Sequence, residues 1–130
     1  MDDLAKLINR LEGSKTLMQI AARSGARKAG LLVEGDAKRL CPVDTGRLRS
    51  SISTETEDTA EGAKAFVSTN AEYAPFVEYG TGERGDPSVP HKLHWAGNPP
   101  HPFLRPALAM NRDSGNIQKV FADEVGKVFR

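Results

Sequence analysis

The stretch Cys41-Pro42-Val43-Asp44-Thr45-Gly46-Arg47-Leu48 separates two parts of the chain that follow different patterns. Before it, apolar and small residues recur every three or four positions, which is the period of a helix. After it, β-branched residues alternate with polar ones in short runs, which is typical of strands. Pro42 disfavours helical geometry in the preceding residue, so we expect the helix to end at Leu40–Cys41. The stretch therefore predicts a corner between a long helix and a small sheet.

The predicted corner consists of Pro42, Asp44, Thr45, Gly46 and Leu48. Asp44 or Thr45 is expected to cap a new turn formed by residues 47–52, because such side chains accept hydrogen bonds from a helix start. Gly46 eases the tight reversal of the chain, and Leu48 anchors the turn to the core. These roles are structural.

Two helical patterns precede the corner. Leu4, Leu7, Ile8 and Leu11 have helical spacing, and Gly13 is expected to end that helix. A second helix is expected to begin at Ser14. Its stripe consists mostly of small residues: Met18, Ala22, Gly25, Ala29, Val33, Ala37 and Leu40. Such a face lets another backbone approach closely but contributes little burial energy, so the helix needs packing partners.

The middle of the chain predicts a hairpin followed by a short helix. Residues 51–57 and 63–69 read as strands joined by a turn, with Phe66 facing away from Ala65 and Val67. Residues 73–79 read as a helical turn that Gly80 ends. Its aromatic residues are three apart, so they are expected to share one face against the hairpin: Tyr73, Phe76 and Tyr79.

Residues 80–106 contain six of the eight prolines and four of the twelve glycines, which predicts a long loop or arm. After Pro106 a helical stripe runs to the C-terminus through Ile117, Val120, Phe121, Val125 and Val128. The fold class is therefore α+β, in one domain spanning residues 1–130. It should contain a long N-terminal helix packed on a small antiparallel sheet, a Pro-rich loop and a C-terminal helix.

Composition excludes several classes of protein. With 38% hydrophobic and 27% charged residues, the chain is neither a membrane protein nor disordered. A single cysteine fits folding in a reducing cytoplasm. The net charge of +1 is divided unevenly, with +4 on residues 1–50, −6 on residues 51–86 and +3 on residues 87–130. This division is either ordinary surface charge or a means of packing identical subunits head to tail.

The tripeptide Asp44-Thr45-Gly46 also occurs in dimeric aspartic proteases, where two carboxylates share one proton. Here a helix rather than an apolar strand leads to it, and Arg47 and Arg49 would keep both carboxylates ionised. A protease site is therefore not expected.

Other catalytic and metal sites are equally weakly supported. Cys41 precedes a proline at a helix end, where a small apolar residue is usually buried. His91, His94 and His101 lie in a Pro-rich segment with no carboxylate between Pro87 and Pro102. We expect no catalytic residues, no metal and no cofactor.

Three motifs in order give the chain a resemblance to a known family. They are Cys41-Pro42-Val43-Asp44-Thr45-Gly46-Arg47-Leu48-Arg49-Ser50-Ser51-Ile52, Tyr73-Ala74-Pro75-Phe76-Val77-Glu78-Tyr79-Gly80-Thr81 and His101-Pro102-Phe103-Leu104-Arg105-Pro106-Ala107. The chain resembles the small tail-component proteins of tailed bacteriophages, which are neck or tail-completion proteins at the head–tail junction. The resemblance extends from about Leu17 to the C-terminal helix.

The resemblance implies a structural virion protein without catalytic activity, assembled in the bacterial cytoplasm. It implies a homo-oligomeric ring, six-fold to match the tail, that completes the tail end and joins it to the head connector. The implied partners are head-closure or connector proteins on one side and tail-terminator or tail-tube proteins on the other. DNA would pass through the lumen, and no membrane is involved.

Subunit or partner contacts are expected in the second and third motifs and in the arm. The expected contact residues are Tyr73, Phe76, Glu78, Tyr79, Gly80, Thr81, Trp95, His101 and Phe103. Trp95 and Phe103 are the candidate anchors, because buried aromatic residues tend to dominate the energy of interfaces. Prolines restrict the free arm and so reduce the entropy that docking costs.

Two functions of other classes stay open. One is a small hydrolase, either the Asp-Thr-Gly dimeric protease or a Cys/His enzyme. The other is a DNA-binding accessory protein that uses basic residues of the long helix, which are Arg23, Arg27, Lys28, Lys38 and Arg39. Such binding would weaken steeply with salt.

Overall fold

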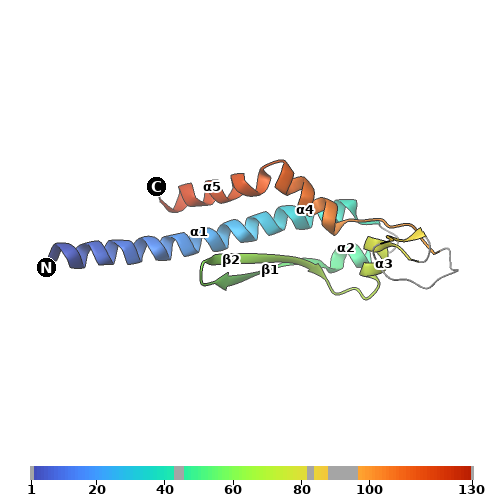
Figure 1. The fold of residues 1–130 in the computed structure, drawn as a ribbon, viewed down its shortest axis with the longest axis horizontal. Helices are drawn as coiled ribbons and strands as arrows, with labels where there is room; N and C mark the ends of the chain where they lie inside the picture. The colour runs from blue at the N-terminus through green and yellow to red at the C-terminus, as the bar shows by residue number, and fades with distance from the viewer. Residues whose placement is uncertain (1, 43–45, 82–83, 88–96, 130) are drawn as a thin grey trace.

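The computed structural model describes residues 2–42, 46–81, 84–87 and 97–129. The chain is α+β, and its longest helix lies between a hairpin on one side and two C-terminal helices on the other (Figure 1). The elements are α1 (Asp2–Leu40), α2 (Arg47–Ser51), β1 (Ile52–Thr59), β2 (Gly62–Thr69), α3 (Ala74–Tyr79), α4 (Leu104–Asp113) and α5 (Asn116–Val128). The predicted fold class is confirmed, although the Pro-rich loop lies largely outside the described residues.

Helix α1 is continuous over 39 residues, so the predicted break at Gly13 and Ser14 is wrong. A single glycine costs a helix about 1 kcal/mol, and strong helix-forming residues on both sides carry the helix through it. At 1.5 Å per residue the helix is about 58 Å long. Its end is as predicted, because the amide of Cys41 makes the last helical hydrogen bond, to the carbonyl of Ala37 at 2.9 Å.

Two glycines of α1 let the neighbouring layers approach its axis. A Cβ at Gly25 would lie 2.4 Å from the ring atom Cδ1 of Phe121 in α5. A Cβ at Gly30 would lie 2.5 Å from Cγ2 of Thr54 and 3.1 Å from Cβ of Ala65 in the hairpin. The small-residue stripe predicted from sequence is buried from Gly25 to Ala37, whereas Met18 and Leu40 at its ends are exposed.

Strands β1 and β2 are antiparallel, with Ile52 opposite Thr69 and Thr59 opposite Gly62. The predicted hairpin is confirmed, with a shorter turn than expected because β1 continues to Thr59. One face packs on α1. Phe66 lies on the other face, opposite Glu55, and is 48% exposed.

The C-terminal region contains two helices where the sequence predicted one. Helix α4 begins at Leu104, so Pro106 lies in its first turn, where a missing amide hydrogen costs little. Gly115 then adopts a left-handed conformation with φ of 82° and separates α4 from α5. Glycine takes this conformation without steric strain.

The core lies where α1, α2, α3 and α4 meet. Its buried residues are Val33, Ala37, Cys41, Leu48, Ile52, Ala71, Ala74, Phe103 and Ala107. At the corner, Gly46 has φ of 76° and Leu48 is buried, both in line with the roles expected of them. Pro42 is exposed, and Asp44 and Thr45 lie outside the described residues, so their capping role stays a prediction. None of the helices in the described ranges is long and apolar enough to cross a membrane.

Candidate assembly surface

The carboxylate of Glu78, at the end of α3, holds the beginning of α4. It accepts hydrogen bonds from the backbone amides of Phe103 at 2.9 Å, Leu104 at 3.1 Å and Arg105 at 3.0 Å. The Arg105 side chain adds a fourth through Nε at 3.1 Å. These amides are the unpaired donors of a helix start, so the Glu78 carboxylate replaces the bonds that the helix cannot make.

The Glu78 side chain is only 4% exposed. Burial by itself would raise the pKa of Glu78, but the amides of Phe103, Arg105 and Leu104 and the Arg105 guanidinium outweigh it. They hold the pKa of Glu78 below its ordinary value, so the group is ionised at neutral pH. Glu78 was expected at a contact surface with other subunits, and the structure instead places its carboxylate inside the subunit.

We call Glu78, Arg105 and the backbone amides that donate to Glu78 the Glu78 cluster. The Arg105 side chain also contacts Tyr79 and Asp86. Its guanidinium lies 4.5 Å from the ring centre of Tyr79 and donates to the carbonyl of Glu78 at 3.2 Å. It also lies 3.5 Å from a carboxylate oxygen of Asp86. The sequence pattern did not single out Arg105. The only available signal was an arginine in the third motif that could pair with the glutamate of the second.

Gly80 is the point at which the arm's two ends come together. Its φ is 75°, and a Cβ there would lie 2.6 Å from the Asn98 carbonyl oxygen and 2.7 Å from the Pro100 nitrogen. We call this close approach of two backbone segments the crossing. Only glycine fits there, because the neighbouring atoms belong to the backbone and cannot rotate away. Gly80 thus acts by letting the two segments meet.

Backbone hydrogen bonds hold the same crossing. The amide of Thr81 donates to the Asn98 carbonyl at 2.8 Å, and the Asn98 amide donates to the Thr81 hydroxyl at 2.9 Å. The amide of His101 donates to the Val77 carbonyl at 2.8 Å. With the hydrogen bonds that Glu78 accepts, these bonds hold residues 77–81 against residues 98–105.

An open pocket of about 450 Å³ lies beside the crossing. Its lining residues are Pro42, Tyr73, Phe76, Val77, Thr81, Asn98, Pro99 and His101. Four of the expected contact residues and one residue of the predicted corner therefore share one surface. We call these lining residues the arm-base surface.

Two more of the expected contact residues, Tyr79 and Phe103, lie away from this pocket. Phe103 is fully buried in the subunit's own core, and Tyr79 lines a different pocket with β2 and α4. Trp95 lies outside the described residues. Phe76 is 60% exposed on the arm-base surface, so the expectation that all three aromatic residues pack against the hairpin is wrong. Tyr73 does pack on the core, and Arg47 lies 6.0 Å from its ring centre.

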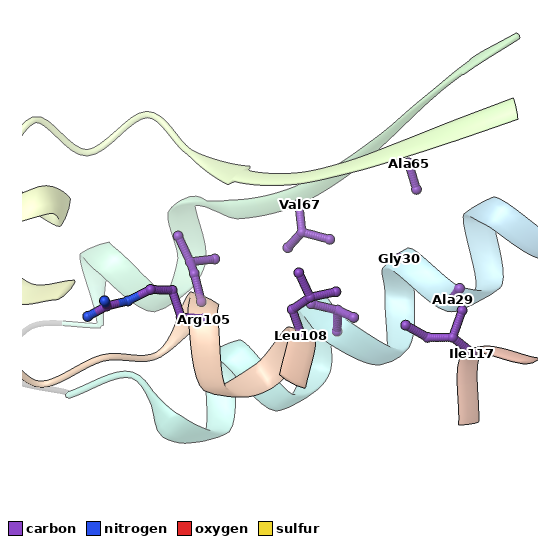
Figure 2. A pocket seen from close by; sticks show the side chains of 9 residues that line it. Ala29, Gly30, Ala65, Val67, Arg105, Leu108 and Ile117 are labelled. Carbon is purple, nitrogen blue, oxygen red and sulfur yellow. The ribbon is translucent and has the colours of Figure 1, made fainter. Parts of the chain in front are cut away.

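A third hollow, of about 320 Å³ and distinct from the one that Tyr79 lines, lies between β2 and α4 with α1 as its floor (Figure 2). Figure 2 shows Ala65 and Val67 on the strand side, Leu108 on the α4 side and Ile117 at one end. Arg105 is the one charged residue among those that line it. Sequence reasoning missed this hollow, because local patterns give no indication of the space left between elements.

Comparison with known protein families matches residues 4–80 to the HK97-gp10-like family, described as "Bacteriophage HK97-gp10, putative tail-component". The match covers more than half of the chain. The chain belongs to this family. Neither the curated proteins nor the solved structures yield a significant match. The resemblance inferred from the sequence motifs is confirmed at the level of a bacteriophage tail component.

The matched region of this HK97-gp10-like chain ends at Gly80, where the arm begins. It includes the corner, α3 and Glu78. It does not include residues 101–107, from which backbone amides donate hydrogen bonds to Glu78.

The residues weighed for catalysis are differently placed in this tail component. Cys41 is buried, and burial raises the pKa of its thiol although Arg49 opposes the shift, which disfavours a reactive thiolate. Asp44, His91 and His94 lie outside the described residues. In the part of the chain that the structure describes, no three His, Cys, Asp or Glu side chains could jointly hold a metal ion.

Most of the basic residues weighed for DNA binding form ion pairs within the subunit. Arg23 pairs with Asp58, Lys28 with Glu124, Lys38 with Glu34 at 3.6 Å, and Arg39 with Asp36 at 2.7 Å. Paired charges present less positive potential to phosphates, so α1 is a weak candidate for a DNA-binding surface.

Proposed function

We propose that this tail component forms a homo-oligomeric, six-fold ring at the head–tail junction. The ring completes the end of the tail and joins it to the head connector. Head-closure or connector proteins would contact one face, tail-terminator or tail-tube proteins the other, and DNA would pass through the lumen. The location that follows is the virion, after assembly in the bacterial cytoplasm.

The observation that carries the proposal is the arm-base surface. Tyr73, Phe76, Thr81 and His101 come from two separate motifs, yet they line one open pocket. The Glu78 cluster fixes this surface in the free subunit, so little ordering entropy would be lost on docking. Apolar aromatic side chains exposed on a rigid base are typical of interaction sites.

The charge distribution also supports assembly from identical subunits. Residues 51–86 carry a net −6, whereas the segments before and after them carry +4 and +3. Surfaces of opposite sign on one subunit favour contact between unlike faces of neighbouring copies, and such contacts close into rings.

The proposal can be tested in a phage whose copy of this gene is inactivated and complemented in trans. Without the protein, heads and tails should accumulate separately, and the wild-type chain should restore joined particles. Phe76→Glu should lower their yield about tenfold or more, because it places a charge in the arm-base surface. The matched control is Phe129→Glu, which changes an exposed phenylalanine near the C-terminus that is not part of the arm-base surface. Normal joining without the protein would contradict the proposed function.

A further inference from the structure

The hairpin has two open edges. Strands β1 and β2 form a two-stranded sheet, so each has a neighbouring strand on one side only. Among the described residues, no backbone–backbone hydrogen bond joins residues 53–59 or 62–69 to a third segment. Every second residue of a strand directs its amide and carbonyl away from the partner strand. Each edge of this hairpin therefore presents a row of backbone groups that no protein partner satisfies.

Two common protections of an open edge are absent from these strands. Neither strand contains a proline, and their register runs without a bulge from Ile52 opposite Thr69 to Thr59 opposite Gly62. Both strands are eight residues long. A long, regular edge of this kind is a template for pairing with a strand of another chain.

The edge of β2 lies beside the apolar hollow of about 320 Å³. Among the described residues that line this hollow, Ala65 and Val67 belong to β2 and none belongs to β1 (Figure 2). Helix α1 contributes Ala29 and Val33 to the floor, and α4 contributes the half-exposed Leu108. The side of the subunit that carries the β2 edge is therefore hollowed and apolar.

The edge of β1 lies on the opposite side of α1, beside an exposed leucine. Leu31 is two positions from both Ala29 and Val33, which is about 200° around the helix, so it points away from the hollow. It is 45% exposed. Glu34 lies on the same side, one turn after Leu31, and accepts a hydrogen bond from Thr54 of β1 at 3.2 Å. A projecting leucine thus accompanies the β1 edge, just as the hollow accompanies the β2 edge.

We propose that the β2 edge of one copy pairs with the β1 edge of a second copy, and that Leu31 of the second copy enters the hollow of the first. The pairing makes one continuous sheet from the hairpins of neighbouring copies. This inference deepens the proposed function and rests on it, since it specifies the contact between neighbouring subunits of the proposed ring.

The spacing of the two layers fits this arrangement. Two strands occupy about 9.5 Å of a sheet, and packed helices lie roughly 8–10 Å apart, so one α1 for each hairpin matches both layers. In a ring whose axis runs along α1, rotation keeps all copies at the same level. Leu31 lies between Ala29 and Val33 along α1, so at equal level it meets the hollow of its neighbour.

The charges of the strands favour contact between unlike edges. Lys64 and Glu57 are opposite each other within one subunit, so at equal level Lys64 of one copy also lies beside Glu57 of the next. Pairing of β1 with β1 would bring Glu55 and Glu57 of both copies together, and like charges across strands are destabilising. Pairing of β2 with β2 would leave both β1 edges open and both Leu31 side chains uncovered.

The charged residues near the second layer do not oppose the contact. Lys38, on the same side of α1 as Leu31, is paired with Glu34 at 3.6 Å. Arg105, at the hollow, is paired with Glu78 at 3.1 Å. Arg27 lies one turn before Leu31 and is exposed, and its long side chain can keep its charge in water beside a packed leucine.

One such contact should be weak by itself. Eight residues give an edge about 27 Å long, and a sheet layer with a helix layer is about 20 Å deep, so the footprint is about 500 Å². This is below the roughly 800 Å² per partner of a stable complex. Because the contact joins two different edges, each copy has one of each left for further neighbours, and a closed ring leaves no edge open.

A weak contact is best trapped by cross-linking. One preparation carries Leu31→Cys and another carries Leu108→Cys, and the two are mixed and treated with a short bismaleimide. Because Cys41 is buried, the introduced thiols are the reactive ones. We expect several-fold more cross-linked dimer than in a control that pairs Leu31→Cys with Met110→Cys. Met110 is also exposed on α4 but does not line the hollow. A mixture no better than this control, or efficient cross-linking of the Leu108→Cys chain with itself, would overturn the proposal.

Amide hydrogen exchange of the cross-linked dimer tests the pairing of the edges. One of the two chains carries a heavy-nitrogen label, so that each peptide can be assigned to its copy. In β2 of the Leu108→Cys copy and β1 of the Leu31→Cys copy, about every second amide should exchange more slowly than in the separate chains. The other β1 and the other β2 should be unchanged. Equal exchange in all four strands would show that the edges do not pair.

These experiments fail independently of the proposed function. Absence of cross-linking in purified protein, while the protein is still needed to join heads and tails, would reject only this contact. Cross-linking and protected edges, with no requirement for the protein in joining, would reject the function and keep the contact.

Discussion

At the residue scale, Glu78 connects two motifs that are separated by nineteen residues of the sequence. Its buried carboxylate accepts bonds from three amides at the start of α4 and from Arg105. A buried acceptor that satisfies several donors is costly to remove, because each donor left unpaired loses its hydration without compensation. Glu78 therefore determines where the third motif begins and how the arm-base surface is held.

Replacing Glu78 by glutamine tests this role. The amide group of glutamine would point a donor at backbone donors, so we expect Glu78→Gln to lower the free energy of unfolding by about 1–3 kcal/mol. Urea denaturation followed by circular dichroism measures the change. Glu72→Gln is the control, since Glu72 is exposed and should change stability by less than about 0.5 kcal/mol. Equal stability of the two variants would contradict the role given to Glu78.

Glu124 predicts a dependence of stability on pH. Hydrogen bonds from Lys28 and Ser24 and the charge of Lys127 outweigh its burial and lower the pKa of Glu124 from 4.5 to about 2. A depressed pKa in the folded state gives stability that is fully present above the unfolded value and is lost as pH falls through the folded value. We therefore expect the free energy of unfolding to fall between about pH 4.5 and pH 2.

Denaturation midpoints measured across this range test the assignment. Glu124→Gln removes the titrating group, so its stability should fall less steeply with decreasing pH than that of the wild-type chain. Glu78 contributes to the fall in both proteins, because its pKa is also lowered. Parallel curves for the two proteins would show that Glu124 does not contribute.

At the element scale, the sequence predicted the elements whose boundaries depend on nearby residues. Pro42 marks the end of α1, and the alternation around residues 52–69 marks the hairpin. The break at Gly13 was wrong because helix formation is cooperative, and flanking residues outweigh one glycine. The division between α4 and α5 was missed because a stripe of apolar residues does not reveal the left-handed conformation of Gly115.

The candidate site was identified in part from the sequence, and its contacts with other proteins stay a prediction. Tyr73, Phe76, Thr81 and His101 were expected contacts, and they share the arm-base surface. The burial of Glu78 and Phe103 was not foreseen, because it depends on contacts between segments about 25 residues apart. Periodicity and spacing describe local structure, so such long-range partners have no signal in a single sequence.

Replacing two glycines of α1 by alanine distinguishes the effect of close packing on stability from the effect of helix propensity. Gly25→Ala would place a Cβ 2.4 Å from the Phe121 ring, and the cost of displacing that ring should exceed the helix propensity gained. We expect Gly25→Ala to destabilise the protein by about 1 kcal/mol net. Gly35→Ala, which has nothing within 4 Å, should stabilise it by about 1 kcal/mol. Thermal unfolding measures both, and stabilisation by both would show that α5 does not pack closely on Gly25.

At the scale of the whole molecule, the described part of the subunit leaves apolar side chains uncovered at both ends. They are Leu4, Leu7, Ile8 and Leu11 near the start of α1, and Phe76 on the arm-base surface. The described core is made largely of small residues, whereas many large apolar side chains are exposed. A subunit of this kind is expected to gain its final stability in an assembly, which agrees with membership of a tail-component family.

The most direct test of the central claim is cryo-electron microscopy of the head–tail junction in intact particles. We expect a six-fold ring at the head-proximal end of the tail, into which six copies of this chain fit. Each copy should be recognisable by a helix of about 58 Å, and the arm-base surface should contact a neighbouring protein. A junction whose density is fully explained by other chains, with this one absent, would show that the proposed function is wrong.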